Sequence, residues 1–397
     1  MQPAILILAA AVLMFSEQSY AQNEVGDEER DVKHVGDDID VLEHGSGIEI
    51  ADVAPTGNPF KKLVAKWPSD LVIAPIPGRS PQLGWKLTLA GGYFLNAREG
   101  EPKHKPSVLG GFGMIAENGS KAYGGGAYLH LLDDKLRVKI GAAYADIRYR
   151  FYGVGNDSGN NDLSLKIQQK GPMYFSSASW RIWSKLYLGV GYLGGDVDSR
   201  LRINLPEDPF FDPVLKLDIG AFVIPIEFDS RDHEQFPRDG WFVTGRSVLY
   251  RESMGSDFET DIFSLAVNRY LPMGEQNVLA LRAYARSTGN NAPFFLLSTF
   301  GGSTDLRGYP SGRYRDRMMY AVQGEYRWQY NDSWIFTGFA GVGEVAESIG
   351  DFGSNFLPAA GIGVRYVLSK KHKVGLSADI AVGIDGTEYY FGVGEAF

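Results

Sequence analysis

From Gly84 onward the chain alternates apolar and polar residues with a period of two. The clearest segment runs from Tyr320 to Gln329, where Tyr, Val, Gly, Tyr and Trp at even positions alternate with residues such as Gln323, Glu325 and Arg327. Segments 374–383 and 279–284 follow the same rule. Because successive side chains of a β-strand point to opposite faces, the pattern predicts strands with one face against lipid and the other beside water.

Counting the alternating segments between turn signals predicts sixteen strands. They begin near Gly84, Val108, Ala122, Leu136, Leu163, Leu186, Leu215, Trp241, Phe258, Asn277, Phe294, Met318, Trp334, Phe356, Lys373 and Glu388. Short links at 118–120, 330–332 and 370–372 follow even-numbered strands, and most long links follow odd-numbered ones; 133–134 and 204–213 are exceptions. Short turns at one end and long loops at the other are typical of outer-membrane barrels.

The C-terminus helps to separate a membrane barrel from a soluble β-sandwich or propeller, whose strands also alternate. Tyr390, Gly392 and Phe397 fit the aromatic, glycine and final aromatic positions of a barrel-assembly signal, although Glu395 stands where an apolar residue is expected. A sheet in hydrocarbon must close on itself to leave no edge unpaired. We therefore predict an all-β transmembrane antiparallel barrel of sixteen strands in a bacterial outer membrane.

Composition agrees with this fold class. The 49 glycines and the 13% aromatic content suit closely paired strands and aromatic girdles. No apolar run is long enough for a membrane-spanning helix, which excludes a helical membrane protein. Cysteine is absent, so disulfides, thiolate metal sites and lipidated cysteines are excluded as well.

The N-terminal region divides into two parts ahead of the barrel. Residues 4–15 are apolar and end near Ser19-Tyr20-Ala21, which predicts a signal peptide over residues 1–21, although no Lys or Arg precedes it. Residues 22–69 are expected to form an acidic, disordered periplasmic extension, because 23–53 contains eleven acidic and two basic residues. The barrel is assigned to residues 70–397, with the Pro-rich segment 72–77 interpreted as a linker into the first strand.

Three motifs at matching strand positions carry a family resemblance. Residues 301–309 read GGSTDLRGY, between the predicted strands eleven and twelve, and residues 339–343 read FAGVG on the thirteenth. Between predicted strands seven and eight the chain reads DSRD at 229–232 and PRDGW at 237–241, with Asp229, Arg231, Asp232, Pro237 and Gly240 as the outer-loop motif. Together these resemble the BamA/TamA surface-antigen superfamily of outer-membrane barrels.

The resemblance implies that the loop bearing Arg307 folds back into the lumen and meets a carboxylate on the wall. A guanidinium offers a planar fork of donors, Gly308 permits close backbone approach, and Tyr309 can stack or wedge. Gly341 stands where the family motif normally has Asp, so the partner is expected to be another carboxylate. We prefer Glu325 over Glu344, because the alternation of its strand places the Glu325 side chain on the inward face. The alternative is that Arg307 is an exposed loop arginine.

The resemblance also implies a role in membrane assembly or in protein or lipid insertion or export, by pairing of substrate strands at a weakly closed seam. The segment 22–68 is too short and too polar for the family's periplasmic transport-associated repeats, so a passive pore or structural barrel stays the alternative. The expected partners are the lipid bilayer, the general assembly machinery for the barrel's own insertion and an unidentified periplasmic partner or client, and not nucleic acid.

Catalytic and metal signals are weak. Residues 189–194 spell a dinucleotide-binding pattern that no helix follows, and Ser230, Asp232 and His233 crowd one loop instead of converging from distant elements. The six histidines show no metal-ligand spacing. We expect no enzymatic activity, no catalytic residue, no metal and no cofactor.

Overall fold

The computed structural model describes residues 71–80, 82–95, 107–155, 164–202, 214–233, 236–299, 301–302, 304–369 and 374–397. The predicted signal peptide at 1–21 and the acidic extension at 22–69 lie outside the described residues. None of the helices in the described ranges is long and apolar enough to cross a membrane.

A single 16-stranded sheet forms the wall of a nearly closed barrel, with its strands in sequence order and all pairs antiparallel. This agrees with the predicted fold class. The barrel strands are β1 (Leu71–Ser80), β2 (Gly84–Leu95), β3 (Ser107–Ala116), β4 (Lys121–Leu131), β5 (Leu136–Phe151), β6 (Leu165–Trp183), β7 (Leu186–Arg202), β8 (Val214–Asp229), β9 (Gly240–Tyr250), β10 (Thr260–Met273), β11 (Asn277–Thr288), β14 (Met318–Gln329), β15 (Trp334–Ala346), β16 (Leu357–Ser369), β17 (Val374–Gly383) and β18 (Gly386–Val393).

Three short 3₁₀ helices and a small two-stranded sheet lie in the loops. The helices are η1 (Glu252–Met254), η2 (Phe294–Leu296) and η3 (Ile349–Asp351). The small sheet pairs β12 (Ser298–Thr299) with β13 (Arg315–Asp316), within the connection from β11 to β14. This connection, residues 289–317, is called the lumen segment below.

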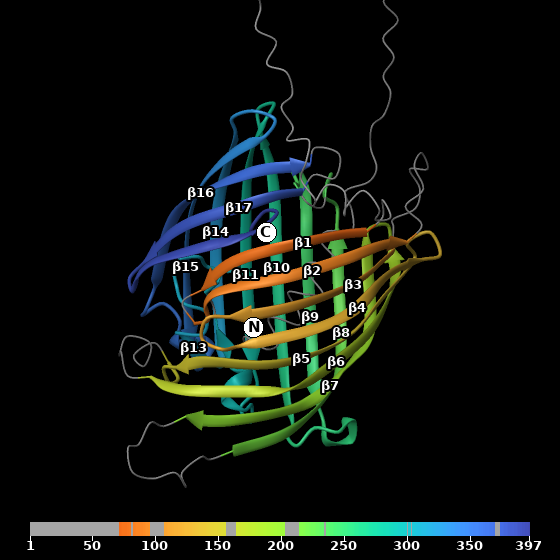
Figure 1. Ribbon diagram of the computed structural model, residues 1–397, viewed down its shortest axis with the longest axis vertical. Coiled ribbons are helices and arrows are strands. Elements are labelled where there is room, and N and C mark those ends of the chain that lie inside the picture. Colours follow the sequence, from red (N-terminus) through yellow and green to blue (C-terminus); the bar gives the residue numbers. More distant parts are fainter. Residues whose placement is uncertain are drawn as a thin grey trace, which may run out of the picture.

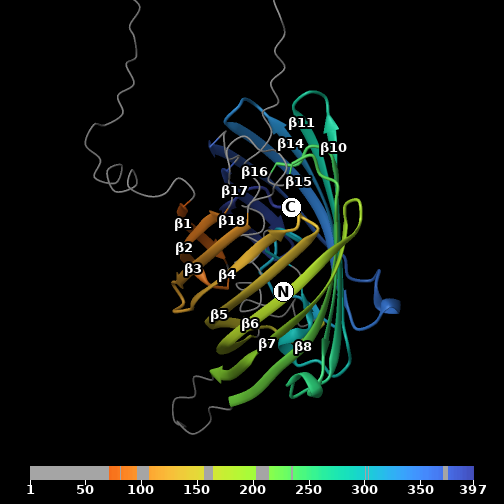
Figure 2. The same ribbon diagram turned by 90° about the vertical axis from the view of Figure 1, so that its right-hand side faces the viewer.

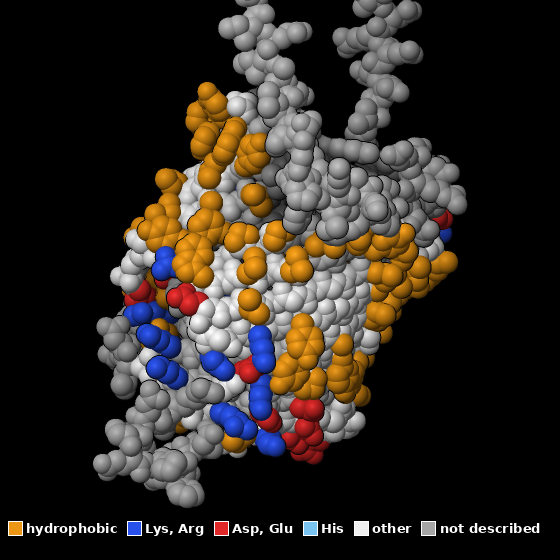
Figure 3. Space-filling model, in the orientation of Figure 1, with side chains coloured by type: hydrophobic (Ala, Val, Ile, Leu, Met, Phe, Trp, Pro, Cys, Tyr) orange, Lys and Arg blue, Asp and Glu red, His pale blue; other side chains and the backbone are white. Residues whose placement is uncertain are grey.

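The wall has an apolar outer face and a polar inner face. On β14, Val322, Tyr326 and Trp328 are exposed, whereas the alternating Glu325 and Arg327 are buried. Figure 3 shows hydrophobic side chains over much of the surface formed by the first strands, and charged side chains gathered at the lower left, where β5 and β7 end. The period of two in the sequence therefore sorts lipid-facing from lumen-facing side chains.

The count of sixteen strands is correct, but two individual assignments were wrong. Segment 72–77, interpreted as a linker, belongs to β1, and the segment beginning near Phe294 is η2 and not a strand. Pro75 and Pro77 hid β1 from the sequence pattern, because proline is unfavourable in a strand unless that strand lies at an edge. The two errors cancel in the total but shift the numbering of every strand from β2 to β11 by one.

This shift reassigns the ends of the barrel. The tight link after Leu131 and the long link after Arg202, which were exceptions to the loop rule, now follow β4 and β7 and obey it. The link 117–120 lies instead at the end with the long loops, and the loop 230–239 lies at the end with the short links. The latter was predicted as an outer loop between strands seven and eight; it joins β8 to β9 at the end that the loop rule makes periplasmic.

The first and last strands meet at what we call the seam. β1 and β18 lie side by side (Figure 2), yet the hydrogen-bonded order of the sheet begins at β1 and ends at β18. The contacts across the seam include Trp85, stacked 6.1 Å from Phe391, and Arg79, 6.0 Å from the Tyr389 ring centroid. Among the described residues the seam is thus held by side chains and not by a strand ladder.

Candidate functional site

The lumen segment passes along the inner wall and places Arg307 in its interior. The Arg307 side chain is completely buried. Its Nη2 donates to Glu325 on β14 at 2.7 Å, and its Nη1 donates to Asp379 on β17 at 2.8 Å. The guanidinium also stacks 3.4 Å from the centroid of the Phe339 ring on β15. One arginine therefore joins the loop to three wall strands.

Arg307 belongs to a larger buried group of ions. Arg327 donates to Glu325 at 2.8 Å, and Arg365 donates both to Asp379 and, at 2.9 Å, to Glu395. We call the set the charge cluster; it consists of Arg307, Arg327, Arg365, Glu325, Asp379 and Glu395. Three positive and three negative side chains balance, which is what a buried ionic group needs, because removing one partner leaves an uncompensated charge.

Gly308 and Tyr309 hold the lumen segment against the last three strands. The Gly308 amide donates to the Tyr390 hydroxyl at 2.9 Å, and the Tyr309 hydroxyl donates to the Pro358 carbonyl at 2.6 Å. Gly308 has φ of +116°, and a Cβ there would meet Ala359 at 3.0 Å and the β17 backbone at 3.1 Å. Glycine is required here for both conformation and space. A salt bridge of 3.1 Å between Arg313 and Asp385 connects the lumen segment to the β17–β18 turn as well.

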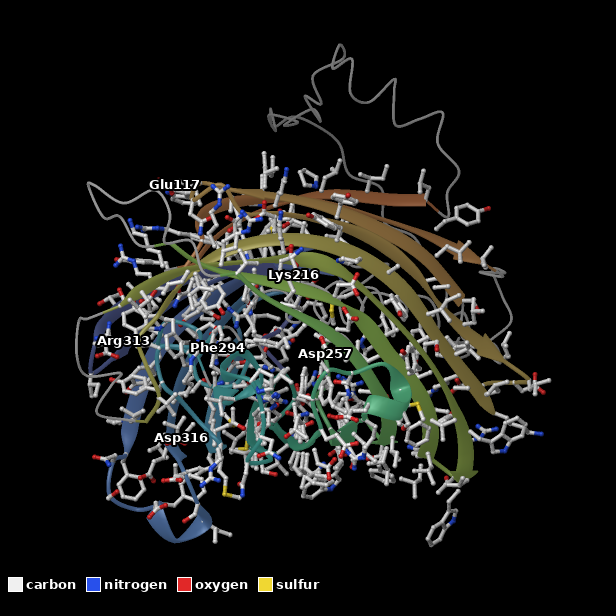
Figure 4. The ribbon with its side chains drawn as sticks, turned by 90° about the horizontal axis from the view of Figure 1, so that it is seen from below. Glu117, Lys216, Asp257, Phe294, Arg313 and Asp316 are labelled. Atoms are coloured by element: carbon white, nitrogen blue, oxygen red, sulfur yellow. The ribbon has the colours of Figure 1, made fainter. Side chains whose placement is uncertain are left out.

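The beginning of the lumen segment packs apolar side chains against the inner wall of the barrel. Phe295 and Leu296 of η2 pack against buried residues of the inner wall, among them Met173, Ile219 and Tyr250. Figure 4, seen from the end with the long loops, places Phe294 within the ring of strands. A barrel of sixteen strands is wide enough for a water channel, and this part of the lumen segment lies inside it.

The chain beyond β18 also turns into the barrel. Arg327 Nη2 donates to the backbone oxygen of Phe397 at 2.7 Å, and the Phe397 ring packs with Tyr270, Val278 and Ala280 on the inner faces of β10 and β11. Figure 1 places the C-terminus within the outline of the barrel. β18 ends at Val393, so Phe397 lies past the last strand, while Tyr390 and Gly392 lie on it. Whether these three residues act as an assembly signal stays a prediction.

The structure separates the two carboxylates that the sequence offered as partners of Arg307. Glu325 lies against it, whereas Glu344 accepts hydrogen bonds from the backbone amides of Gly353, Ser354 and Asn355 in the β15–β16 loop. Gly341 has no room for a larger side chain, because a Cβ there would meet Leu306 at 2.9 Å and the Val322 carbonyl at 2.6 Å. Leu306 therefore occupies the space that an aspartate would need.

Asp379, Arg365 and Glu395 were not predicted as members of this site. Asp379 and Arg365 had an available signal, since both are charged residues at inward positions of alternating strands. Glu395 had a second one, because it breaks the apolar pattern expected near the C-terminus. What the sequence did not indicate is that these residues converge from β16, β17 and the chain after β18.

The described residues of the loop after β8, 230–233 and 236–239, bond to one another and to the flanking strand ends at the short-link end. Arg231 makes a two-point contact with Asp229, both hydrogen bonds 2.9 Å long, and lies 3.8 Å from the Phe242 ring centroid. Asp232 Oδ1 accepts the backbone amides of His233, Arg238 and Asp239. Pro237 is buried, and Gly240 has φ of +110° beside the Ser230 carbonyl. Three of the five predicted motif residues thus lie in this loop and the other two, Asp229 and Gly240, at the strand ends beside it, remote in sequence from the charge cluster.

Asp239 extends this loop to the neighbouring strand. Arg269 Nη1 donates to Asp239 at 2.8 Å, and the Gly240 amide donates to the same carboxylate. These two hydrogen bonds lower the pKa of Asp239 below its ordinary value. The carboxylate therefore keeps its charge, and the loop its anchor, under mildly acidic conditions.

Comparisons with known proteins agree with the geometry. The sequence model of the Omp85 superfamily domain matches residues 221–397. None of the curated proteins matches this chain by sequence. Among solved structures, BamA from Haemophilus ducreyi lacking POTRA domains 1–3 is similar with a TM-score of 0.56 at 14% identity, covering 82% of this chain and 70% of that one.

Two CdiB structures are also similar. CdiB from Escherichia coli has a TM-score of 0.58 at 12% identity over 82% of this chain, and CdiB from Acinetobacter baumannii has 0.54 at 12% over 81%. This chain spans 63% and 58% of their respective lengths. At such identities the likeness shows a shared fold.

The fold and the matched domain define an outer-membrane β-barrel whose fold is similar to that of the BamA barrel. This chain carries an Omp85 superfamily domain over residues 221–397, and the family resemblance seen in the sequence motifs is thereby confirmed.

Proposed function

We propose that this barrel acts in assembly of the outer membrane, inserting or exporting protein or lipid through its wall at the seam. The single observation that supports this most is the absence of a strand ladder between β1 and β18 in the described residues. In hydrocarbon, unpaired backbone groups are costly, so a sheet edge left without a ladder favours pairing with another strand.

The contacts of the lumen segment with the inner wall support a route through the wall over one along the barrel axis. The lumen segment packs on the inner wall from β6 to β10 through Phe295 and Leu296, and on β14 to β18 through Arg307 and Tyr309. Moving it would break the charge cluster and expose apolar side chains. Parting the seam would leave the charge cluster intact, because none of its members lies on β1 or β2, and the described contacts across the seam include the ring contacts of Arg79 and Trp85.

The experiment is to delete the gene and quantify every outer-membrane protein and lipid class against wild type. We expect selective loss of particular barrels, surface proteins or lipids, restored by the wild-type gene. The chain has no cysteine, so a variant with cysteines at Arg79 and Tyr389, joined by a short thiol crosslinker, should fail to restore them. The same variant without crosslinker is the control.

A passive pore is the alternative function. It would leave the membrane composition of the deletion strain unchanged while altering solute uptake, and purified protein would conduct steadily in a planar bilayer. The proposal expects low conductance from the wild-type barrel, because the lumen segment obstructs the axial path.

A further inference from the structure

The two edges that meet at the seam differ in their capacity for hydrogen bonding. In an antiparallel sheet, the N–H and C=O of one residue point to the same neighbouring strand, and those of the next residue point to the opposite side. Either the odd-numbered or the even-numbered residues of an edge strand therefore direct their backbone groups to its unpaired edge. One backbone hydrogen bond together with the strand register is enough to decide which set does so.

On β1 the seam edge is formed by the odd-numbered residues. The Glu117 amide donates to the Trp85 carbonyl at 2.7 Å, so odd residues of β2 face β3 and even residues face β1. The β1–β2 register pairs even residues with even ones, as in Gly78 with Lys86. The odd residues of β1 consequently direct their backbone groups toward β18.

Two of these odd residues are Pro75 and Pro77, in the middle of the strand. Proline has no backbone N–H, so the seam edge of β1 lacks two consecutive donors and keeps them only near its ends. Prolines on an edge strand are a recognised way of preventing further strand pairing. This accounts for the missing ladder without any distortion of the β1–β2 pairing, which spans all ten residues of β1.

On β18 the seam edge is also odd-numbered, but it is complete. The Val367 amide donates to the Ser333 carbonyl at 2.8 Å, so odd residues of β16 face β15, and the registers through β17 then turn the even residues of β18 toward β17. The remaining backbone groups belong to Thr387, Tyr389, Phe391 and Val393. All four retain the N–H and the C=O.

We propose that β18 carries the strand-accepting edge of this barrel, and that its occupant is an extended strand of another outer-membrane polypeptide, paired antiparallel in the place next to β18 that β1 now borders. This rests on the proposed function and specifies its site. The occupant must supply backbone donors that β1 lacks. Its outward side chains must be apolar, because Tyr389 and Phe391 are both 43% exposed on the lipid-facing side.

The lumen segment keeps this edge in position. Tyr390 of β18 is bonded to Gly308, and Asp385 before β18 to Arg313, so the lumen segment holds β18 from inside. The described contacts of the lumen segment with β1–β2 are fewer and include the hydrogen bond from Gln82 to the Ser311 carbonyl at 3.2 Å. When the seam parts, β1 and β2 therefore move and β18 stays.

The test places a photoactivatable benzoylphenylalanine at Tyr389 or at Ile73 in the full chain, in its own cells. The two positions are matched, since their side chains are 43% and 40% exposed on the outward faces of the two seam strands. We expect adducts with outer-membrane polypeptides from position 389 and several-fold fewer from 73. Adducts mainly from position 73, only with lipid, or only with a second copy of this chain would overturn the proposal.

A second variant tests the role of the prolines. Pro75→Ala with Pro77→Ala restores two donors, so the yield of crosslinking between cysteines at 79 and 389 should rise several-fold and client adducts at 389 should fall. Pro225→Ala in β8, away from the seam, should change neither. Unchanged crosslinking in the double variant would overturn the inference, while loss of barrels on gene deletion would still uphold the proposed function; an unaltered membrane would reject both.

Discussion

The carboxylate of Glu395 accepts a hydrogen bond of 2.9 Å from Nε of Arg365, so the chain turns into the barrel immediately after its last strand. Arg365 also binds Asp379, which in turn binds Arg307 of the lumen segment. The position of the C-terminus and the position of the lumen segment are thus coupled through one buried arginine.

Glu395→Gln should release the chain after β18 while leaving the barrel folded. The substitution removes a charged partner from Arg365, and hydrogen bonds to charged groups contribute about 2 kcal/mol. Carboxypeptidase should then remove Phe397 faster than from wild type. Glu347→Gln, at an exposed carboxylate paired with Arg317, is the matched control. Equal trimming of the two variants would contradict the coupling.

Arg307→Ala should loosen the lumen segment. In this variant Glu325 keeps its ion pair with Arg327, and Asp379 keeps its ion pair with Arg365. The loss of folding stability should therefore lie near the lower limit for breaking a buried ion pair, about 3 kcal/mol. Limited proteolysis within 289–317 and single-channel conductance should both increase.

Arg307→Lys should give an intermediate result, because lysine keeps the charge but loses the planar fork that reaches two carboxylates. Arg317→Ala serves as the control, since Arg317 lies in the same segment with a partly exposed ion pair. If Arg307→Ala and Arg317→Ala behave alike in both assays, Arg307 does not hold the segment in place.

Gly341→Ala should destabilise the barrel more than Gly338→Ala on the same strand. The added methyl would lie 2.6 Å from the Val322 carbonyl and 2.9 Å from Leu306 at position 341, and would meet nothing within 4 Å at position 338. Overpacking typically costs about 1–3 kcal/mol. The midpoint of heat-induced unfolding, followed by electrophoretic mobility, measures the difference in stability. Identical midpoints for the two variants would mean that Leu306 can move aside without loss of stability.

Leu132→Gly should stabilise the β4–β5 turn. Leu132, Asp133 and Asp134 have φ of 55°, 57° and 58°, a left-handed conformation that costs a non-glycine residue about 1–2 kcal/mol. Leu132 is 60% exposed, so little packing is lost. The denaturant midpoint should rise, and Leu131→Gly, in the preceding strand, should lower it. A fall for both variants would show that lipid contact of Leu132 outweighs backbone strain.

The sequence by itself determined the class of fold, the inward and outward faces of most strands and the residue at the centre of the lumen segment. A period of two is a local property, so it can be recognised in the sequence of one strand without knowing which strand pairs with it. Glu325 could be predicted as the partner of Arg307 because the alternation of side chains along its strand places Glu325 on the inward face.

Only the tertiary structure decided which strands are which and what meets inside the lumen. β1 was hidden because its prolines are tolerated solely at an edge, and an edge exists only once the sheet is assembled. Asp379 binds Arg307 from 72 residues further along the chain, and Glu395, beyond the last strand, reaches the same charge cluster through Arg365. Local patterns carry no information about closure of a barrel, because the contacts that closure creates depend on the shape of the whole wall.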